Sequence, residues 1–381
     1  MTEKRKIRVL ECIRQGKIGG GESHLLDLVE NLDKTRFEPV VLSFTDGPMI
    51  KRLNDMGVKS HIIYTEKPFD FTKWKAVKKL LIDEKIDLVH AHGTRANSNV
   101  NWAARSLGIP VAYTIHGWSF HQDQNFLLRN LRIMGEKYLT SRTNLNISIS
   151  DSNQKAGKKY IRGFKSRMIR YGVNTQRFNP AGQYVDIRKE LDIPADKVLV
   201  VFVARVTHHK QPLALVKAFA EAVAVHPGLH LLMVGDGDQK EQVVELVKNL
   251  NISEHVTLQP FRQDVPAVLA SADVFVLPSL WEGLPLGLLE AMTMGKAIIA
   301  SNVDGTCDVI EHYKDGILVE TDKLVNNLVE PLITVGKDAN LRKDLQTASL
   351  ETAHKRFSIV SMMNDVEQIY LDLLHGGSQS R

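Results

Sequence analysis

Short apolar runs alternate with amphipathic segments along almost the whole chain, and few folds accommodate such a pattern. In the first half, apolar runs at residues 7–13, 39–44 and 110–115 are typical of buried strands, while residues 22–32 carry leucine and valine at helical spacing. Alternation of this kind predicts a parallel, doubly wound α/β sheet with helices on both faces. The other strands expected in this half are residues 58–64, 87–90, 145–149 and 168–171, and the other helices are residues 49–56, 72–84, 96–107 and 126–139.

A turn-rich stretch at residues 172–194, with Pro180, Gly182 and Pro194, interrupts the pattern and predicts a linker between two domains. The alternation then restarts, with strands expected at residues 198–204, 229–234, 256–258, 274–277, 297–300 and 316–319. Residues 359–374 predict a further amphipathic helix after the second sheet is complete. With 381 residues, 43% of them hydrophobic, the chain can bury two such cores.

Residues 279–301 join two of the apolar runs of the second half through a helix. Pro285 suits a first helical turn, and Gly295 is the residue type that best ends a helix in a left-handed conformation. Glu282 is therefore expected in a loop at the carboxyl end of a strand, where open α/β sheets bind ligands, with Glu290 one turn inside the helix. Such carboxylates accept hydrogen bonds from sugar hydroxyls, and the free amides of a first helical turn bind phosphate.

This string resembles the Glu-x7-Glu signature of retaining glycosyltransferases, in the large group that includes bacterial polysaccharide and lipopolysaccharide enzymes. The resemblance implies two Rossmann-like domains facing a cleft, the GT-B architecture. The first domain would comprise residues 1–179, completed by a C-terminal helix at about 359–381, and the second, which binds the nucleotide-sugar, residues 180–358. It also implies transfer with retention of the anomeric configuration and without a metal.

Two cations follow the strand expected at residues 198–204. Arg205 and Lys210 at the carboxyl end of a strand suit a diphosphate whose negative charge grows as its bond to a sugar breaks. They are similar to the family's Gly-Arg-x4-Lys-Gly pattern, although Ala204 and Gln211 replace its glycines. A solvated turn has the same appearance, so the spacing alone leaves both interpretations open.

In the first domain, Gly20 and Gly21 lie in a loop whose glycines let backbone amides approach a phosphate or a sugar closely, and a flexible turn is the alternative. His116 follows a strand and matches the family's histidine that contacts the donor sugar. The resemblance implies a catalytic set and a substrate-binding set. The catalytic set is His116, Arg205, Lys210 and Glu282; the substrate-binding set is Gly20, Gly21, Asn174, Arg262, Gly283, Leu284, Pro285, Leu286, Gly287 and Glu290.

No metal or other cofactor is expected. His90 and His92 have no third ligand of suitable spacing in the sequence. Asp236 and Asp238 form an Asp-x-Asp string that binds a metal–nucleotide in a different glycosyltransferase fold. In the two-domain family, arginine and lysine neutralise the diphosphate instead.

Charge is distributed unevenly along the chain. Residues 1–180 contain 31 Lys and Arg against 17 Asp and Glu, whereas the rest contains 18 against 27. Basic and apolar residues also mix at 73–81, where a helix packed on its sheet explains them equally well. The same mixture at 118–132 favours a face that contacts the acceptor and an anionic membrane. No nucleic-acid motif is present. The two cysteines, Cys12 and Cys307, are far apart in the sequence, which predicts a protein of the reducing cytoplasm. The expected membrane contact would then be peripheral and at the inner face of the cytoplasmic membrane.

The expected function is transfer of a sugar from a nucleotide-sugar, with UDP as the expected nucleotide, to a hydroxyl of a lipid-linked or oligosaccharide acceptor in cell-envelope polysaccharide synthesis. Two alternatives stay open from the residues. One is a glycoside hydrolase that uses Glu282 and Glu290 as its two carboxylates. The other is a non-catalytic nucleotide-sugar-binding protein whose site has degenerated, as the lost glycines around Arg205 suggest.

Overall fold

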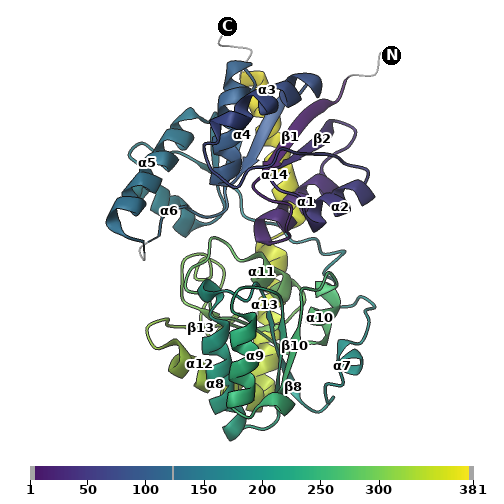
Figure 1. The fold of residues 1–381 in the computed structure, drawn as a ribbon. Helices are drawn as coiled ribbons and strands as arrows, with labels where there is room; N and C mark the ends of the chain where they lie inside the picture. The colour runs from purple at the N-terminus through teal and green to yellow at the C-terminus, as the bar shows by residue number, and fades with distance from the viewer. Residues whose placement is uncertain (1–4, 122–123, 377–381) are drawn as a thin grey trace. The chain divides into compact units, whose positions relative to one another are not determined.

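The computed structural model describes residues 5–121 and 124–376, which fall into two compact units (Figure 1). Unit 1 lies within Met1–Gly172 and Val360–Arg381, and unit 2 is Val173–Ile359. The units therefore divide after Gly172, where the sequence predicts a boundary after 179. The ends of the expected first domain and of its C-terminal helix, residues 1–4 and 377–381, lie outside the described residues.

Unit 1 contains a seven-stranded parallel sheet in the order β3-β2-β1-β4-β5-β6-β7. Its strands are β1 Ile7–Ile13, β2 Phe37–Ser43, β3 Lys59–Ile62, β4 Leu88–His92, β5 Val111–Ile115, β6 Leu145–Ser148 and β7 Arg167–Met168. Its helices are α1 Gly20–Asn31, α2 Pro48–Asp55, α3 Trp74–Asp83, α4 Thr94–Ser106, α5 Phe126–Arg142, α6 Asp151–Tyr160 and α14 Ile359–Gly376, with a 3₁₀ turn at Phe71–Lys73.

Unit 2 contains a six-stranded parallel sheet in the order β10-β9-β8-β11-β12-β13. Its strands are β8 Val198–Val203, β9 Leu229–Val234, β10 Val256–Gln259, β11 Val274–Leu277, β12 Ala297–Ser301 and β13 Ile317–Val319. Its helices are α7 Ile187–Glu190, α8 Pro212–Val225, α9 Lys240–Asn249, α10 Val265–Ser271, α11 Leu286–Thr293, α12 Leu324–Lys337 and α13 Ala339–Arg356, with 3₁₀ turns at His208–Lys210 and Ser253–His255. The predicted α/β class, with two doubly wound sheets, is confirmed.

Each sheet has a point at which the strand order reverses. In unit 1 the reversal lies between β1 and β4, and in unit 2 it lies between β8 and β11. The loops that leave the carboxyl ends of two such strands run in opposite directions and leave room for a ligand between them. The topology therefore points to one candidate ligand-binding edge in each unit.

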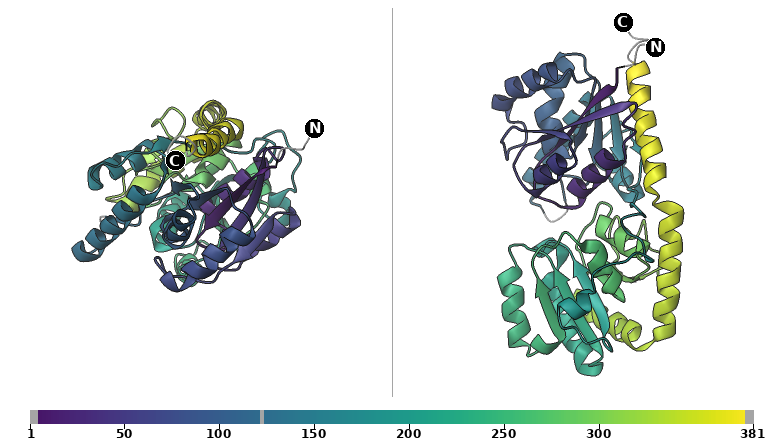
Figure 2. Two further views of the ribbon diagram at one scale, coloured as in Figure 1. Left: turned by 90° about the horizontal axis from the view of Figure 1, so that it is seen from above. Right: turned by 90° about the vertical axis from the view of Figure 1, so that its right-hand side faces the viewer.

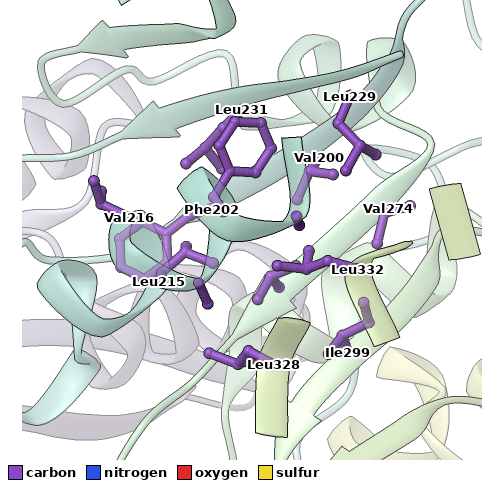
Figure 3. Packing of buried hydrophobic residues seen from close by; sticks show 14 of the residues in the cluster. Val200, Phe202, Leu215, Val216, Leu229, Leu231, Val274, Ile299, Leu328 and Leu332 are labelled. Carbon is purple, nitrogen blue, oxygen red and sulfur yellow. The ribbon is translucent and has the colours of Figure 1, made fainter. Parts of the chain in front are cut away.

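One hydrophobic cluster of unit 2 lies between its sheet and the helices that cover one face. Phe202 of β8 and Leu231 of β9 pack with Leu215 of α8 and with Leu328 and Leu332 of α12 (Figure 3). These strands are apolar almost throughout because both faces of a parallel sheet are covered. The core keeps the strand ends in place and so fixes the loops that leave them.

In unit 1, the two faces of the central strands differ in character. Leu10 and Cys12 of β1 belong to an apolar cluster with Tyr113 of β5. The residue between them, Glu11, points to the opposite face, where it meets Tyr370 of α14. Helix α14, yellow in Figure 2, lies beside β1, so the last helix of the chain covers a strand formed by the first residues described.

Candidate active site

At the candidate edge of unit 2, the loop after β8 meets the loop after β11. Lys210, in the 3₁₀ turn after β8, forms an ion pair with Glu282, which follows β11. The Ser279 hydroxyl donates a second hydrogen bond to the same carboxylate oxygen, with an Oγ–Oε1 distance of 2.5 Å. The side chains of Lys210 and Glu282 are only 15% and 10% exposed. Two polar partners therefore fix the Glu282 carboxylate before any ligand is present.

Backbone contacts hold these loops against one another. The Leu280 amide donates to the His209 carbonyl oxygen at 2.8 Å, joining the two loops directly. Gly305, in the loop after β12, has a φ of +83°, and a Cβ there would lie 2.5 Å from the Gly283 carbonyl oxygen. Only glycine fits such a conformation at that distance. Glycine at position 305 is therefore required for the loop after β12 to pack against the Glu282 loop.

Helix α11 begins directly after the Glu282 loop. Pro285 is its N-cap, one position earlier than the first-turn position that its sequence suggests, and no side chain of the described residues caps the helix. The first-turn amides and the helix dipole therefore favour an anion at this end. Gly295 ends the helix region with a φ of +63°, as predicted. Gly283–Gly287 therefore directly follow Glu282 in the chain, and the half-buried Glu290 lies within α11.

Two predicted arginines have different surroundings. Arg205 is exposed at the end of β8, and within the described part of the chain no ion pair involves its guanidinium group. Arg262 instead bonds Glu190 of α7 and Asp264, and these two carboxylates raise its pKa above the usual range. The structure thus holds Arg262 in an ion-pair network and leaves Arg205 facing solvent.

Asp236, the first aspartate of the Asp-x-Asp string, already has two partners within unit 2. Asp236 forms an ion pair with Lys240 and accepts a hydrogen bond from the Phe261 amide at 2.8 Å. Both contacts lower the pKa of Asp236, with the Lys240 hydrogen bond the larger cause. A carboxylate with these partners serves to fasten the loop after β9 to the loop after β10.

Three predicted residues, Gly20, Gly21 and His116, belong to unit 1, and Gly21 lies against His116. Gly21, at the start of α1, lies against the ring of His116, since a Cβ there would be 3.5 Å from the His116 Cδ2 atom. Gly20 precedes it and has open space where a Cβ would lie. Asn174 belongs to unit 2, where its side chain accepts hydrogen bonds from the amides of Gln176 and Arg177.

Sequence reasoning missed most of the residues that surround His116. Its Nε2 atom is 3.0 Å from Nδ1 of His92, and its Nδ1 atom is hydrogen-bonded to the Tyr171 hydroxyl. His92 in turn contacts Glu11, and His24 of α1 stacks on Tyr171. A charged residue in the middle of an apolar strand was the signal available for Glu11. No local signal connects His116 to Tyr171, because the two are 55 positions apart.

Glu11, His90 and His92 are of the types that bind metals, and their ligand atoms lie within 4.8 Å of one another. Glu11 is thus a third potential ligand that spacing alone did not reveal. However, both carboxylate oxygens and all four ring nitrogens already have hydrogen-bond partners inside the protein. We therefore assign no metal to this group.

The outer face of α5 is apolar and exposed. Phe126 and Leu127 are 77% and 80% exposed, and Leu131 and Met134 are 66% and 67% exposed. Basic residues Arg129, Arg132, Lys137 and Arg142 belong to the same helix. Among the described residues, no helix combines the length and apolar character needed to cross a bilayer. The mixture is instead that of a surface helix with basic and apolar side chains.

Comparison with known proteins agrees with this geometry. The sequence-family model of Glycosyl transferases group 1 matches residues 184–352, and that of Glycosyltransferase Family 4 matches residues 18–177. The chain is 26% identical to the Escherichia coli UDP-Gal:alpha-D-GlcNAc-diphosphoundecaprenol alpha-1,3-galactosyltransferase, over 97% of this chain and 98% of the relative. It is 28% identical to the Campylobacter jejuni N,N'-diacetylbacillosaminyl-diphospho-undecaprenol alpha-1,3-N-acetylgalactosaminyltransferase, over 84% of this chain and 88% of the relative.

Solved structures show the same fold. The Anabaena HepE structure in complex with UDP and glucose superposes with a TM-score of 0.84 and 21% identity, over 96% of this chain and 100% of that one. The two family models together match most of both units, and the structural match extends across nearly the whole chain. The chain therefore belongs to the group 1 glycosyltransferases with a family 4 N-terminal part, and it is an enzyme of the hexosyltransferase type.

Proposed function

We propose that this enzyme moves a sugar from a UDP-sugar to a hydroxyl of a lipid-linked or saccharide acceptor, with retention of configuration and without a metal. The observation that carries the proposal is the Lys210–Glu282 pair at the start of α11. It places a fixed carboxylate and a cation next to a helix end that favours phosphate. The names of the two relatives, one of which includes UDP-Gal and both of which include an undecaprenol diphosphate, support the donor and acceptor classes.

The predicted residues around the loops after β8 and β11 then have roles in the proposed reaction. Glu282, held by Lys210 and Ser279, accepts hydrogen bonds from donor-sugar hydroxyls, and Glu290 accepts them from the ribose. Arg205, Lys210 and the amides of Gly283–Gly287 stabilise the negative charge that grows on the departing diphosphate. Since these groups supply the positive charge, no metal is needed. In unit 1, His116 and Gly21 would position the sugar.

The function is tested by incubating the full chain with a panel of nucleotide-sugars and undecaprenyl-diphosphate-linked sugars while released nucleotide is measured. We expect acceptor-dependent UDP release that an excess of EDTA leaves unchanged, and a product whose anomeric proton coupling matches that of the donor sugar. Arg205→Ala should lower the rate about tenfold to a hundredfold, whereas Lys248→Ala, an exposed cation of α9, should leave it unchanged. Inversion at the anomeric carbon, or loss of activity in EDTA, would contradict the proposed mechanism.

Glycoside hydrolysis is the alternative that the same experiment separates. A hydrolase would cleave unactivated glycosides with no nucleotide in the mixture. Such an enzyme needs its two carboxyl groups on opposite sides of the bond that breaks. Glu282 instead bonds Lys210 and Ser279, which lie at the same edge of the unit 2 sheet. This arrangement favours binding of a sugar over acid catalysis.

We also propose that α5 brings unit 1 to an anionic membrane surface. Its exposed Phe126 and Leu127 would enter the headgroup region while Arg129 and Arg132 meet the lipid phosphates. An acceptor carried by a lipid would then be within reach of unit 1. Charge complementarity favours the lipid, because residues 1–180 have a large excess of basic residues.

Sedimentation with vesicles checks the membrane proposal. We expect the protein to sediment with phosphatidylglycerol vesicles at low salt, to be released as salt rises, and to ignore neutral phosphatidylcholine vesicles. Phe126→Ser with Leu127→Ser should abolish sedimentation. The matched control, Val185→Ser with Val225→Ser, changes two exposed apolar residues of unit 2 and should sediment normally. Equal binding by the two double variants would contradict a role for α5.

A further inference from the structure

Unit 1 contains a buried cluster of titratable side chains that the proposed reaction does not use directly. Glu11 of β1, His90 and His92 of β4, and Tyr370 of α14 are all at most 1% exposed, and Tyr171 is 3% exposed. Hydrogen bonds join them into a chain that ends at His116 and Tyr171. Because the Glu11 carboxylate can only accept hydrogen bonds, the direction of every bond in the chain can be worked out from it.

The first branch starts at one oxygen of Glu11. The Tyr370 hydroxyl donates to Glu11 Oε1 at 2.7 Å, so its oxygen is left to accept from His90 Nδ1, also at 2.7 Å. His90 therefore carries its proton on Nδ1, and in the neutral ring its Nε2 accepts from the Thr114 hydroxyl at 2.7 Å. This branch lies on the face of the unit 1 sheet that α14 covers.

The second branch starts at the other oxygen of Glu11 and reaches the candidate site. His92 Nε2 donates to Glu11 Oε2 at 2.9 Å, so a neutral His92 has its lone pair on Nδ1. His116 Nε2, 3.0 Å away, must then donate to that lone pair. With its proton on Nε2, His116 has a lone pair on Nδ1, which accepts from the Tyr171 hydroxyl.

The electrostatics of the cluster agree with neutral rings on this branch. Burial lowers the pKa of His92 to about 4 and that of His116 well below its usual value. Burial alone would raise the pKa of Glu11, but His90 and His92 outweigh it and hold that pKa below its ordinary range. The branch therefore has a carboxylate at one end and neutral imidazoles leading away from it.

We propose that Glu11 and His92 are positioning residues that lock His116 as its Nε2–H tautomer, so that its Nδ1 is a hydrogen-bond acceptor for an alcohol. Tyr171 supplies that alcohol in the structure, and a hydroxyl of the sugar substrate replaces it during the reaction. A neutral acceptor suits a hydroxyl and gives no stabilisation to a diphosphate, so His116 selects the sugar part of the donor. Only the kinetic part of this inference rests on the proposed function.

Two substitutions of His92 separate the links of the branch. In His92→Asn, the amide oxygen takes the place of Nδ1 and still accepts from His116, but the link to Glu11 is lost. In His92→Gln, the amide nitrogen takes the place of Nε2 and still donates to Glu11, but the acceptor for His116 is lost. The pair therefore tests the tautomer of His116 with side chains of similar polarity. His354→Gln, an exposed histidine of α13, is the control.

The tautomer is read from long-range proton–nitrogen NMR spectra of the chain labelled with ¹⁵N-histidine, with the His116 signal assigned from its absence in His116→Gln. We expect a neutral His116 protonated on Nε2 in the natural protein and in His92→Asn, and a mixture of tautomers in His92→Gln. UDP release should show kcat/KM at least about tenfold lower in His92→Gln than in His92→Asn, while the affinity for UDP alone stays unchanged in both.

A natural protein whose His116 is protonated on Nδ1, or on both nitrogens, would overturn the inference, and that spectrum needs no variant to fold. An unaltered tautomer in His92→Gln would overturn it too, as would one equivalent of tightly bound metal, because a metal would replace the proton of His92 Nε2. If no nucleotide-sugar is turned over, the proposed function fails, yet the spectra still decide the tautomer.

Discussion

Lys210→Met is expected to lower the rate of UDP release by about a hundredfold to a thousandfold, the usual cost of removing one group that stabilises charge in the transition state. Two losses combine in this variant. The departing diphosphate loses a cation, and the Glu282 carboxylate, which is 10% exposed, loses the ion pair that holds it. Methionine preserves most of the length and volume of the lysine side chain, so the effect arises from charge. Steady-state rates with saturating donor measure it.

Lys217→Met is the matched control for this prediction, because Lys217 is an exposed lysine of α8 in the same unit. Its rate should match that of the natural protein. Adding Glu282→Gln to Lys210→Met should cost much less than the product of the two single effects, since each single change already breaks the same pair. A Lys210→Met enzyme with normal activity would show that the pair has no role in transfer.

Acidification from pH 7 to pH 5 is expected to destabilise unit 1 strongly. Burial lowers the pKa of His24, His92 and His116 in the folded chain, that of His92 to about 4. The unfolded chain therefore binds more protons below about pH 6.5, and stability falls as the pH falls toward 4. His92 alone contributes a loss on the order of 2 kcal/mol at pH 5. Burial raises the pKa of Glu136, which acts in the opposite direction but is outnumbered.

Urea unfolding followed by tryptophan fluorescence measures this loss. Trp281→Phe leaves only the tryptophans of unit 1, Trp74, Trp102 and Trp118, so the signal reports that unit alone. We expect a lower urea midpoint at pH 5 than at pH 7, and a smaller difference once His24 is replaced by phenylalanine. His354→Phe, which changes an exposed histidine of α13, should keep the full difference. A midpoint that does not vary with pH would contradict buried neutral histidines.

Most of the secondary structure follows from the sequence because parallel strands covered on both faces are continuous apolar runs. The strand expected at residues 274–277 coincides with β11, and the strand at 297–300 differs from β12 by one residue. Errors concentrate at the edges of the unit 1 sheet, where strands are short and half-exposed. Residues 58–64 were expected as a strand and β3 is Lys59–Ile62, while residues 168–171 contribute only Met168 to β7.

Sequence spacing brings candidate-site residues together only where they share one stretch of chain, whereas Lys210 and Glu282, 72 positions apart, were assigned to one site through the family resemblance. Glu282, Gly283–Gly287 and Glu290 are contiguous with α11, so spacing alone places them together. The partner of Arg262 was not predictable, because Glu190 lies 72 positions away in another helix. The same holds for Glu11, whose partner Tyr370 is 359 positions away and is brought to it by the packing of α14. Long-range pairing depends on how helices pack, which a local pattern does not encode.

The position of Tyr370 has a consequence for how the chain is made. A ribosome releases residues from the N-terminus onward, so β1 emerges well before α14, whose Tyr370 hydroxyl meets Glu11 from 359 positions further along the chain. Until α14 has been synthesised, the Glu11 carboxylate and the His90 imidazole lack their hydrogen-bond partner Tyr370. Unit 2, which lies between these segments in the sequence, can finish folding while unit 1 is still incomplete. The strands of unit 1 thus depend on α14 before unit 1 can reach its native state.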